Sequence, residues 1–332
     1  MQAAQLSVGL DVGGTKTAAL LVDSSSCVLG QTTVPTHTAT PDELLATITR
    51  AIHAVLAEAN ATPQQIRSIG LGVPGQVDPA TGIVKLAVNL NLQTFPLGPT
   101  ISARFKAPTF LENDVRTAAI GAFDYLRQTE PVQSIAYVSI GTGIAAGVIL
   151  NGRLHRGQNG MAGEIGHMTV EPDGELCNCG LRGCLETIVA GPAMIRQMNI
   201  ASPQNQVQNA GAVYEAAAQG NQAAQQVVQR VSQHLSRAIQ WLIMTYDVEK
   251  VLLGGGVTRS GEAFLAPILR ELARLRQQST LAAELLPDEK LYLIPPDYNP
   301  GVWGAVHLAN QMSSETITHI SANDKGRSSL KT

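Results

Sequence analysis

Three of the chain's four cysteines, Cys177, Cys179 and Cys184, fall close together in the stretch GEIGHMTVEPDGELCNCGLRGCLE at 163–186. With His167 just before them, they make a Cys₃His set, which is a standard closed tetrahedral zinc site. Because four protein ligands leave no open position, we expect a structural zinc. Disulfides are the alternative, but a bridge between Cys177 and Cys179 would be strained, and such clusters in a reducing compartment more often bind metal.

Two carboxylates lie at the edges of this cluster. Glu164 is three residues before His167, and Glu186 is two residues after Cys184. If zinc orders the segment, both glutamates would be positioned to accept hydrogen bonds from a polyhydroxyl ligand such as a sugar. The alternative is that both are ordinary surface charges.

Three glycine-rich turns, DVGGTKT, SIGTGIAAG and LLGGGVT, each follow an apolar strand. Glycine lets the backbone approach a phosphate closely, and the exposed N–H groups of such a turn can line its oxygens. The chain has no GxxxxGK[ST] loop, and GTGIAAG is a poor dinucleotide fingerprint. A tight structural turn is the alternative at each place. Three of them at strand ends favour a phosphate-binding protein.

Two acidic positions accompany these turns. Asp11 stands just before the glycines of the first turn, where it could hold a Mg²⁺-bound water beside a phosphate. The sequence LENDV puts Glu112, Asn113 and Asp114 at the end of a strand that opens a helix. An Asn or Asp there can simply cap the helix. Phosphoryl transfer to an alcohol, however, needs a carboxylate that accepts the hydroxyl proton and orients the oxygen.

The helices and strands expected to position these residues form a repeated pattern. Residues 6–23 predict strand, glycine turn and strand, 41–60 an amphipathic helix, 66–78 a buried strand broken at Pro-Gly, and 108–126 a strand followed by a helix. At 134–152 the pattern restarts, with YVSIGTG matching GLDVGGT position for position. A duplicated strand-hairpin-helix unit, with a cleft between the halves, is the economical interpretation.

The second half continues with a helix at 222–247 and a parallel-type strand at 248–258. A last helix is expected at 301–311, followed by a polar, aperiodic tail. One apolar stripe runs along the 222–247 helix and comprises Val227, Val228, Val231, Leu235, Ile239, Leu242 and Ile243.

The bulk composition limits the possible classes. A chain of 332 residues with 44% hydrophobic and 15% charged residues fits a compact protein of two domains. A net charge of −3 gives no electrostatic case for nucleic acid. No apolar run reaches the roughly 18–20 residues that span a bilayer, and the first residues lack signal-peptide features, so we expect a cytoplasmic location.

Over residues 6–311 the chain resembles the ROK family (repressors, open reading frames, kinases) of sugar kinases, within the hexokinase–actin superfamily. GMAGEIGHMTV followed by CNCGLRGCLE matches the family signature and its zinc site. The resemblance implies an α/β fold of two domains, hexokinase/actin-like and thus ribonuclease H-like, with an interdomain cleft. The expected parts are a small domain of 1–118 with 301–312, a large domain of 119–300, and a disordered tail of 313–332.

The same resemblance implies that the glycine turns bind ATP with Mg²⁺. The turns resemble the two phosphate motifs and the adenosine motif of the family. The implied nucleotide residues are Asp11, Gly13, Gly14, Thr15, Gly141, Thr142, Gly143, Gly254, Gly255 and Gly256.

The resemblance also assigns the sugar site, with Asp114 as the catalytic base for the 6-hydroxyl. His167 would serve twice, with one ring nitrogen on zinc and the other towards the sugar. Where many members carry tryptophan in the loop AVNLNLQTFPL, this chain has Leu92. The implied sugar-binding residues are Gly75, Asn89, Asn113, Asp114, Glu164, His167 and Glu186.

The predicted function is therefore ATP-dependent phosphorylation of a hexose, with closure of the domains on the sugar expelling water. Glucose is the leading substrate; N-acetylglucosamine, mannose, N-acetylmannosamine and fructose are alternatives, and polyphosphate is an alternative donor. A homodimer or higher homo-oligomer is implied by the resemblance. A repressor of the same family is disfavoured because no basic recognition helix is visible. A non-catalytic sugar-binding protein is disfavoured because Asp11 and Asp114 are both present.

Overall fold

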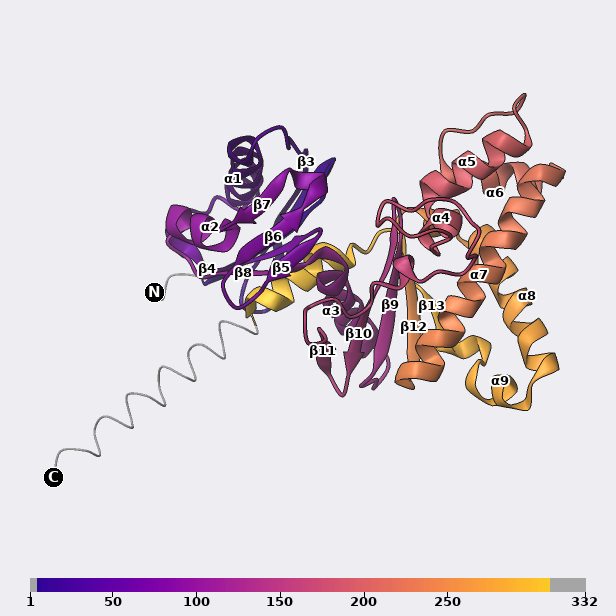
Figure 1. The fold of residues 1–332 in the computed structure, drawn as a ribbon. Helices are drawn as coiled ribbons and strands as arrows, with labels where there is room; N and C mark the ends of the chain where they lie inside the picture. The colour runs from indigo at the N-terminus through magenta and orange to yellow at the C-terminus, as the bar shows by residue number, and fades with distance from the viewer. Residues whose placement is uncertain (1–4, 311–332) are drawn as a thin grey trace. The chain divides into compact units, whose positions relative to one another are not determined.

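A computed structural model describes residues 5–310 of the chain (Figure 1). Internal contacts divide it into two compact units, of which the first holds residues 5–125 with 299–310 and the second holds 126–298. Each unit has its own hydrophobic core. The tail predicted at 313–332 lies outside the described residues.

The first unit is built on a five-stranded sheet of order β3-β2-β1-β4-β8. β1 (Leu6–Val12) pairs antiparallel with β2 (Lys16–Val22), which pairs with β3 (Val28–Pro35). On its other side β1 runs parallel to β4 (Ile66–Val73), and β4 runs parallel to β8 (Thr109–Asn113). The carboxyl ends of β1, β4 and β8 therefore meet at one edge of the sheet.

Helix α1 (Pro41–Glu58) confirms the amphipathic helix predicted from the sequence. Its start is fixed locally, because the Thr40 side chain accepts a hydrogen bond from the Glu43 backbone N–H and a proline opens the first turn. The helix packs closely on β3: a Cβ atom added at Gly30 would lie 2.5 Å from the Val55 carbonyl oxygen.

A small antiparallel sheet, which the sequence did not reveal, follows β4. It consists of β5 (Gln76–Asp78), β6 (Ile83–Ala87) and β7 (Leu92–Phe95). The 3₁₀ turn η2 (Val88–Leu90) joins β6 to β7, and α2 (Leu97–Phe105) packs beneath. The short 3₁₀ turn η1 lies at Pro63–Gln65.

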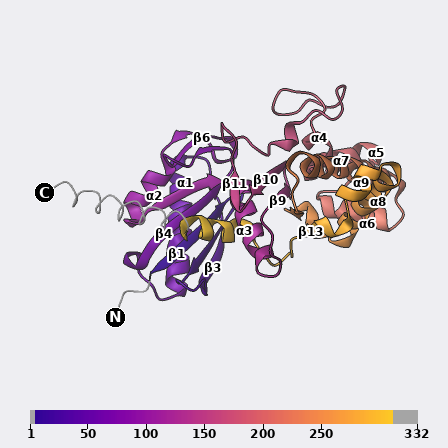
Figure 2. The same ribbon diagram turned by 90° about the horizontal axis from the view of Figure 1, so that it is seen from below.

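The first unit is completed by α3 (Asp114–Arg127) and by a helix at 300–310, the segment where a last helix was predicted. The returning helix lies against the sheet, beside β1 and β4 (Figure 2). An added Cβ at Gly70 would lie 1.9 Å from the Ala305 carbonyl oxygen, and one at Gly304 would lie 1.7 Å from the Thr117 carbonyl oxygen. Only glycine permits these approaches. The expected domain limit after residue 118 falls inside α3.

The second unit repeats the sheet of the first. Its order is β11-β10-β9-β12-β13, with β9 antiparallel to β10 and parallel to β12, as β1 is to β2 and β4. The restart predicted at 134–152 is thereby confirmed. The strands are β9 (Ile135–Ile140), β10 (Ile144–Leu150), β11 (Arg153–His155), β12 (Lys250–Gly254) and β13 (Leu291–Leu293).

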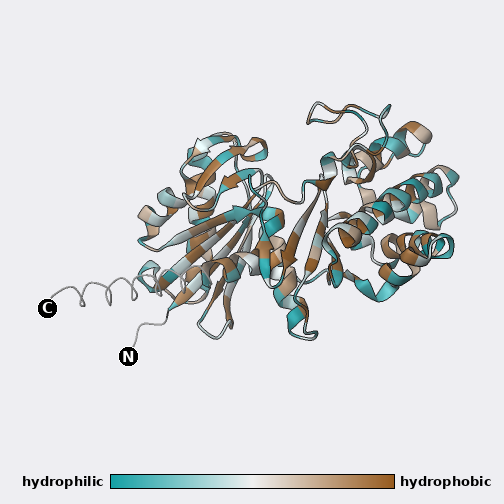
Figure 3. Ribbon diagram, turned by 60° about the horizontal axis from the view of Figure 1, so that its bottom comes forward, coloured by the Kyte–Doolittle hydropathy of each residue, from teal (hydrophilic) through white to brown (hydrophobic). Residues whose placement is uncertain are grey.

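A layer of helices covers this second sheet. The longest helix in the described part of the chain is α7 (Gln222–Tyr246), and its predicted apolar stripe is buried throughout. In Figure 3 the strands are rich in hydrophobic residues, whereas the helices carry both kinds. Among the described residues, no helix is long and apolar enough to cross a membrane. The other elements of the layer are η3 (Ile165–His167), α4 (Glu186–Val189), α5 (Gly191–Ala201), α6 (Ala210–Ala218), η4 (Val257–Ser260), α8 (Glu262–Gln278), α9 (Thr280–Leu285) and η5 (Asp288–Lys290).

Candidate active site

Two of the predicted acidic residues emerge at the same edge of the first sheet. In the strand register Asp11 lies beside Gly72, and Gly72 lies beside Glu112. Asp114 follows Glu112 by two residues, at the start of α3. Because these three strands are parallel, the sheet brings Asp11 and Asp114 to one edge although about a hundred positions separate them in the chain.

Asp11 is electrostatically unusual. Burial, and secondarily the nearby charge of Asp114, raise the pKa of its carboxyl to about 7, while Lys16 acts in the opposite direction. The start of the helix at 300–310 abuts the carboxylate, since an added Cβ at Gly301 would lie 2.6 Å from Asp11 Oδ2. Two carboxylates of this kind favour a bound cation, which would offset both the burial and the repulsion. Asp11 therefore fits the predicted Mg²⁺-associated role.

Asn113 is held on two sides by the protein itself. Its Oδ1 accepts hydrogen bonds from the backbone N–H groups of Val115 (3.0 Å) and Arg116 (3.2 Å), so it caps α3. Its Nδ2 donates to the Gly75 carbonyl oxygen at 3.1 Å. Asn113 therefore has the helix-capping role that the sequence analysis considered as the alternative. Its contact with a sugar stays a prediction.

Gly75 occupies a position that only glycine tolerates. Its φ is +87°, and an added Cβ would lie 2.2 Å from the Leu86 carbonyl oxygen on β6. Together with the bond from Asn113, this contact fixes the turn after β4 against the small sheet.

A buried ion pair supports the junction between β8 and α3, from which Asp114 projects. Arg116 Nε donates to Glu112 Oε1 at 2.9 Å, and the side chains are 4% and 0% exposed. The same carboxylate oxygen accepts the Asn113 backbone N–H at 2.9 Å. Sequence reasoning gave Glu112 and Arg116 no part, although their spacing of four residues at a helix start was a visible signal.

The predicted sugar loop lies against the first glycine turn. Asn89 is exposed in η2, and an added Cβ at Gly14 would lie 3.1 Å from the Asn89 carbonyl oxygen. The turn itself is closed by the Gly13 N–H, which donates to the Lys16 carbonyl at 3.0 Å. Leu92, at the position where tryptophan was noted, is buried in the core of this unit.

The second and third glycine turns meet in the second unit. The Gly141 N–H donates to the Gly143 carbonyl at 2.9 Å. Gly255, with φ +97°, packs so closely on the Ile140 carbonyl oxygen that an added Cβ would lie 2.4 Å away. Gly256 N is 3.9 Å from the Cβ position of Gly141. The turns after β9 and β12 thus lie against each other.

The remaining residues of the predicted turns differ in exposure. Thr15 and Thr142 are exposed at the tips of the two hairpins. Gly254 is buried at the end of β12, where an added Cβ would meet the Tyr137 hydroxyl oxygen at 2.5 Å.

Glu186 contacts the second glycine turn directly, a contact that the sequence did not predict. Its Oε2 accepts the Ile144 N–H at 3.3 Å and lies 2.3 Å from the position of an added Cβ at Gly143. The partners are 42 positions apart, so no local pattern could have signalled the contact.

Glu164 and His167 are placed beside the same part of β10. The Ala146 N–H donates to the Gly163 carbonyl at 2.8 Å, so the segment that carries both residues runs beside β10. This contact comes before the part of β10 that pairs with β11. Both side chains are half-buried.

The four predicted zinc ligands converge. Their donor atoms all lie within 4.8 Å of one another, with Cys177 Sγ 3.6 Å from His167 Nδ1 and Cys179 Sγ 3.6 Å from Cys184 Sγ. Ligands at about 2.3 Å around a tetrahedral zinc would be about 3.7 Å apart, so the set fits that ion. All four cysteines are free thiols, and a disulfide would need sulfurs about 2 Å apart. Nδ1 of His167 faces the cluster, so Nε2 is the nitrogen that does not.

The ROK family matches residues 7–312, so the chain belongs to the ROK family, and the predicted membership is confirmed. It is 32% identical to a glucokinase of Halalkalibacterium halodurans over 275 residues, which cover 79% of this chain and 83% of that protein. It is also 30% identical to the DNA-binding transcriptional dual regulator NagC of Escherichia coli over 79% of this chain and 66% of that one.

Solved structures of ROK-family kinases have a similar fold. A ROK hexokinase from Thermus thermophilus superposes with a TM-score of 0.78 at 30% identity, covering 94% of this chain and 100% of that one. A ROK glucokinase from Streptomyces griseus, solved with glucose and AMPPNP, gives a TM-score of 0.76 at 28% identity over 92% and 99%. The predicted α/β fold of hexokinase type is thereby confirmed.

Proposed function

We propose that this ROK-family sugar kinase transfers the γ-phosphoryl group of ATP to the 6-hydroxyl of a hexose, with glucose as the preferred substrate. The observation that carries the proposal is the arrangement of Asp11 and Asp114 at one sheet edge, close enough for one charge to perturb the other. One carboxylate for the nucleotide's metal and one for the acceptor hydroxyl are what phosphoryl transfer to an alcohol requires.

Asp114 is assigned as the general base. It lies in the first turn of α3, where the helix dipole favours the ionised carboxylate, and the Val115 N–H donates to its Oδ1 at 2.9 Å. The buried pair of Glu112 and Arg116 holds the junction from which it projects. Held in this way, Asp114 accepts the proton of the sugar hydroxyl and orients its oxygen for attack on phosphorus.

The other assignments follow the same geometry. Asp11 would help to hold Mg²⁺, which would supply positive charge to the phosphates when bound. Glu164 and Glu186 would accept hydrogen bonds from sugar hydroxyls, and Nε2–H of His167 would donate one. Zinc would keep the segment around His167 ordered. Asn89, Asn113 and Gly75 are the proposed sugar contacts of the first unit. The nucleotide phosphates are assigned to the three glycine turns.

The choice of glucose draws its support from the glucokinase relatives. N-acetylglucosamine, mannose, N-acetylmannosamine and fructose remain the competing substrates, and polyphosphate the competing donor. We also propose a homodimer, as the family resemblance implies, which light scattering of the purified protein would test.

A coupled ADP-release assay over these five sugars, with ATP and then polyphosphate as donor, tests the proposal. We expect turnover with ATP to be fastest for glucose, as judged by kcat/KM. Faster turnover with another sugar would reassign the substrate, and turnover with none would remove the kinase assignment.

Sugar binding without catalysis is the second candidate, because a transcriptional regulator is among the relatives at 30% identity. Calorimetry separates the two: hexose binding without ADP release would favour the regulator, whereas binding with turnover favours the kinase.

A further inference from the structure

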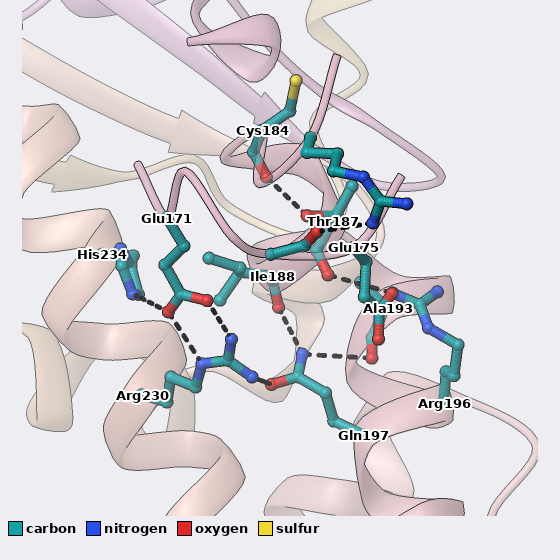
Figure 4. A network of polar contacts seen from close by, with 12 residues as sticks. Glu171, Glu175, Cys184, Thr187, Ile188, Ala193, Arg196, Gln197, Arg230 and His234 are labelled. Atoms are coloured by element: carbon teal, nitrogen blue, oxygen red, sulfur yellow. Dashed lines mark hydrogen bonds and ion pairs between the residues drawn. The ribbon is translucent and has the colours of Figure 1, made fainter. Parts of the chain in front are cut away.

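The cysteine-bearing loop is attached to the helical layer through one glutamate. Glu171 lies between His167 and Cys177, and its carboxylate accepts two hydrogen bonds from one guanidinium: Arg230 Nε donates to Oε1 at 3.2 Å, and Nη2 donates to Oε2 (Figure 4). His234 Nε2, one turn further along α7, lies 3.1 Å from the same Oε1. Planar bidentate geometry of this kind fixes orientation as well as distance.

Arg230 also reaches a second element. Its Nη1 donates to Gln197 Oε1 at 2.8 Å, and Gln197 Nε2 donates to the carbonyl oxygens of Ile188 at 2.8 Å and Ala193 at 3.1 Å. Ile188 belongs to α4, the short helix that begins with Glu186. One guanidinium on α7 thus connects the cysteine-bearing loop, α5 and α4 (Figure 4).

A parallel connection strengthens the same junction. Arg196 on α5 pairs with Glu175 of the loop and donates from Nη2 to the Thr187 carbonyl oxygen at 3.0 Å. Thr187 Oγ1 donates in turn to the Cys184 carbonyl at 2.7 Å. The loop end that carries the last zinc ligand and the helix that carries Glu186 are therefore held by the same two helical arginines.

The charges in this network are balanced. The Arg230 hydrogen bonds hold the pKa of the Glu171 carboxyl below its ordinary value, and burial lowers the pKa of His234. His234 is therefore neutral at pH 7, so its Nε2–H donates to Glu171 and the ion pair remains one positive and one negative charge. The facing charges are Glu171, Arg230 and Arg237.

We propose that Arg230 and Glu171 are positioning residues for the hexose site, which hold the cysteine-bearing loop and α4 so that His167 and Glu186 together face the sugar. This inference rests on the proposed function. The four zinc ligands fix the inside of the loop, whereas Arg230 fixes the loop relative to the helix that carries Glu186.

The exposure of the pair makes the proposal testable. The Arg230 and Glu171 side chains are 43% and 33% exposed, so the pair contributes little to global stability. A purely structural pair in this place would leave the hexose affinity of the folded protein unchanged. A positioning pair, in contrast, affects the ligand site much more than the melting temperature, because partners behind a binding residue typically matter about 10–100-fold.

The experiment compares Arg230→Gln with Arg274→Gln, which makes the same change of charge at a part-exposed ion pair with Glu271 on α8, outside this network. For each purified protein we would measure the glucose Kd by calorimetry, KM for glucose and for ATP, zinc content and melting temperature. We expect Arg230→Gln to raise the glucose Kd and KM about tenfold or more, with ATP KM within about twofold and zinc retained. Arg230→Lys should restore part of the affinity, since lysine keeps the charge without the fork.

Each other result has a defined meaning. A wild-type protein that phosphorylates glucose, with an unchanged glucose Kd in Arg230→Gln, overturns this inference and leaves the kinase assignment intact. Loss of zinc together with affinity also overturns it, because the pair would then act by retaining metal. A wild-type protein that neither binds nor phosphorylates any hexose removes the proposed function, and the inference with it.

Discussion

Replacing Asp11 by asparagine should stabilise the protein in the absence of nucleotide and metal while reducing its activity. The carboxyl has a pKa raised to about 7 in the fold, against an ordinary value of 3.8. The native state therefore binds more protons than the unfolded state between these values, so its stability falls as the pH rises from about 4 to 7. Asparagine does not titrate, and the variant escapes this loss.

The magnitude follows from the shift. About three pKa units correspond to about 4 kcal/mol, at 1.36 kcal/mol per unit. Since Asp11 keeps some contact with solvent, we expect about half of this, ~2 kcal/mol, above pH 7. For a unit of this size, that difference amounts to about 4–8 °C in melting temperature.

The assay is thermal unfolding from pH 4 to pH 8 without Mg²⁺ or ATP, with Asp114→Asn as the matched control. Asp11→Asn should melt above the wild type at pH 8, and the difference should shrink towards pH 4. Asp114→Asn, which removes the second cause of the shift, should recover a smaller part. Adding ATP with Mg²⁺ should stabilise the wild type more than Asp11→Asn. A difference between Asp11→Asn and wild type that is absent, reversed or independent of pH would refute the reasoning.

Three further predictions concern the supporting structure. Cys184→Ser should remove the zinc, measured as metal per chain, and weaken hexose binding at least tenfold, whereas exposed Cys27→Ser should change neither. Gly75→Ala should lower the free energy of unfolding by about 1–3 kcal/mol, measured by chemical denaturation, and raise the hexose KM. Gly220 has a similar φ of +88°, but an added Cβ there would have nothing within 4 Å. Gly220→Ala should therefore show a smaller loss of stability and no change in KM. Arg116→Met should cost about 3–5 kcal/mol by the same denaturation, because it removes the guanidinium that balances the buried Glu112 carboxylate. A loss below 1 kcal/mol would contradict that account.

Much of the fold could be predicted from the sequence because local patterns carry it. The buried strands that precede the glycine turns, the amphipathic α7 and the restart at 134–152 all follow from periodicity and turn chemistry. The small sheet β5-β6-β7 was missed because its strands are short. The edge strand β3 was also missed, because its apolar and polar residues alternate only weakly and five of its eight residues are exposed.

The candidate site was predictable as a set of residues but not as a geometry. The clustering of His167 with the three cysteines could be predicted because a metal site imposes donor types and close spacing. The contact of Glu186 with the Ile144 N–H and the bond of Arg230 to Glu171 join residues 42 and 59 positions apart, and no local rule signals them. For Asn113, the helix-capping role considered from the sequence is the one that the structure shows.

The most direct test of the central claim is a comparison of Asp114→Asn with the wild type in glucose phosphorylation and glucose binding. The account predicts a fall in kcat of about 10²–10⁴-fold, as expected for a lost general base, with the glucose Kd changed by less than about tenfold. Turnover close to that of the wild type in the variant would contradict the assignment of Asp114 as the base.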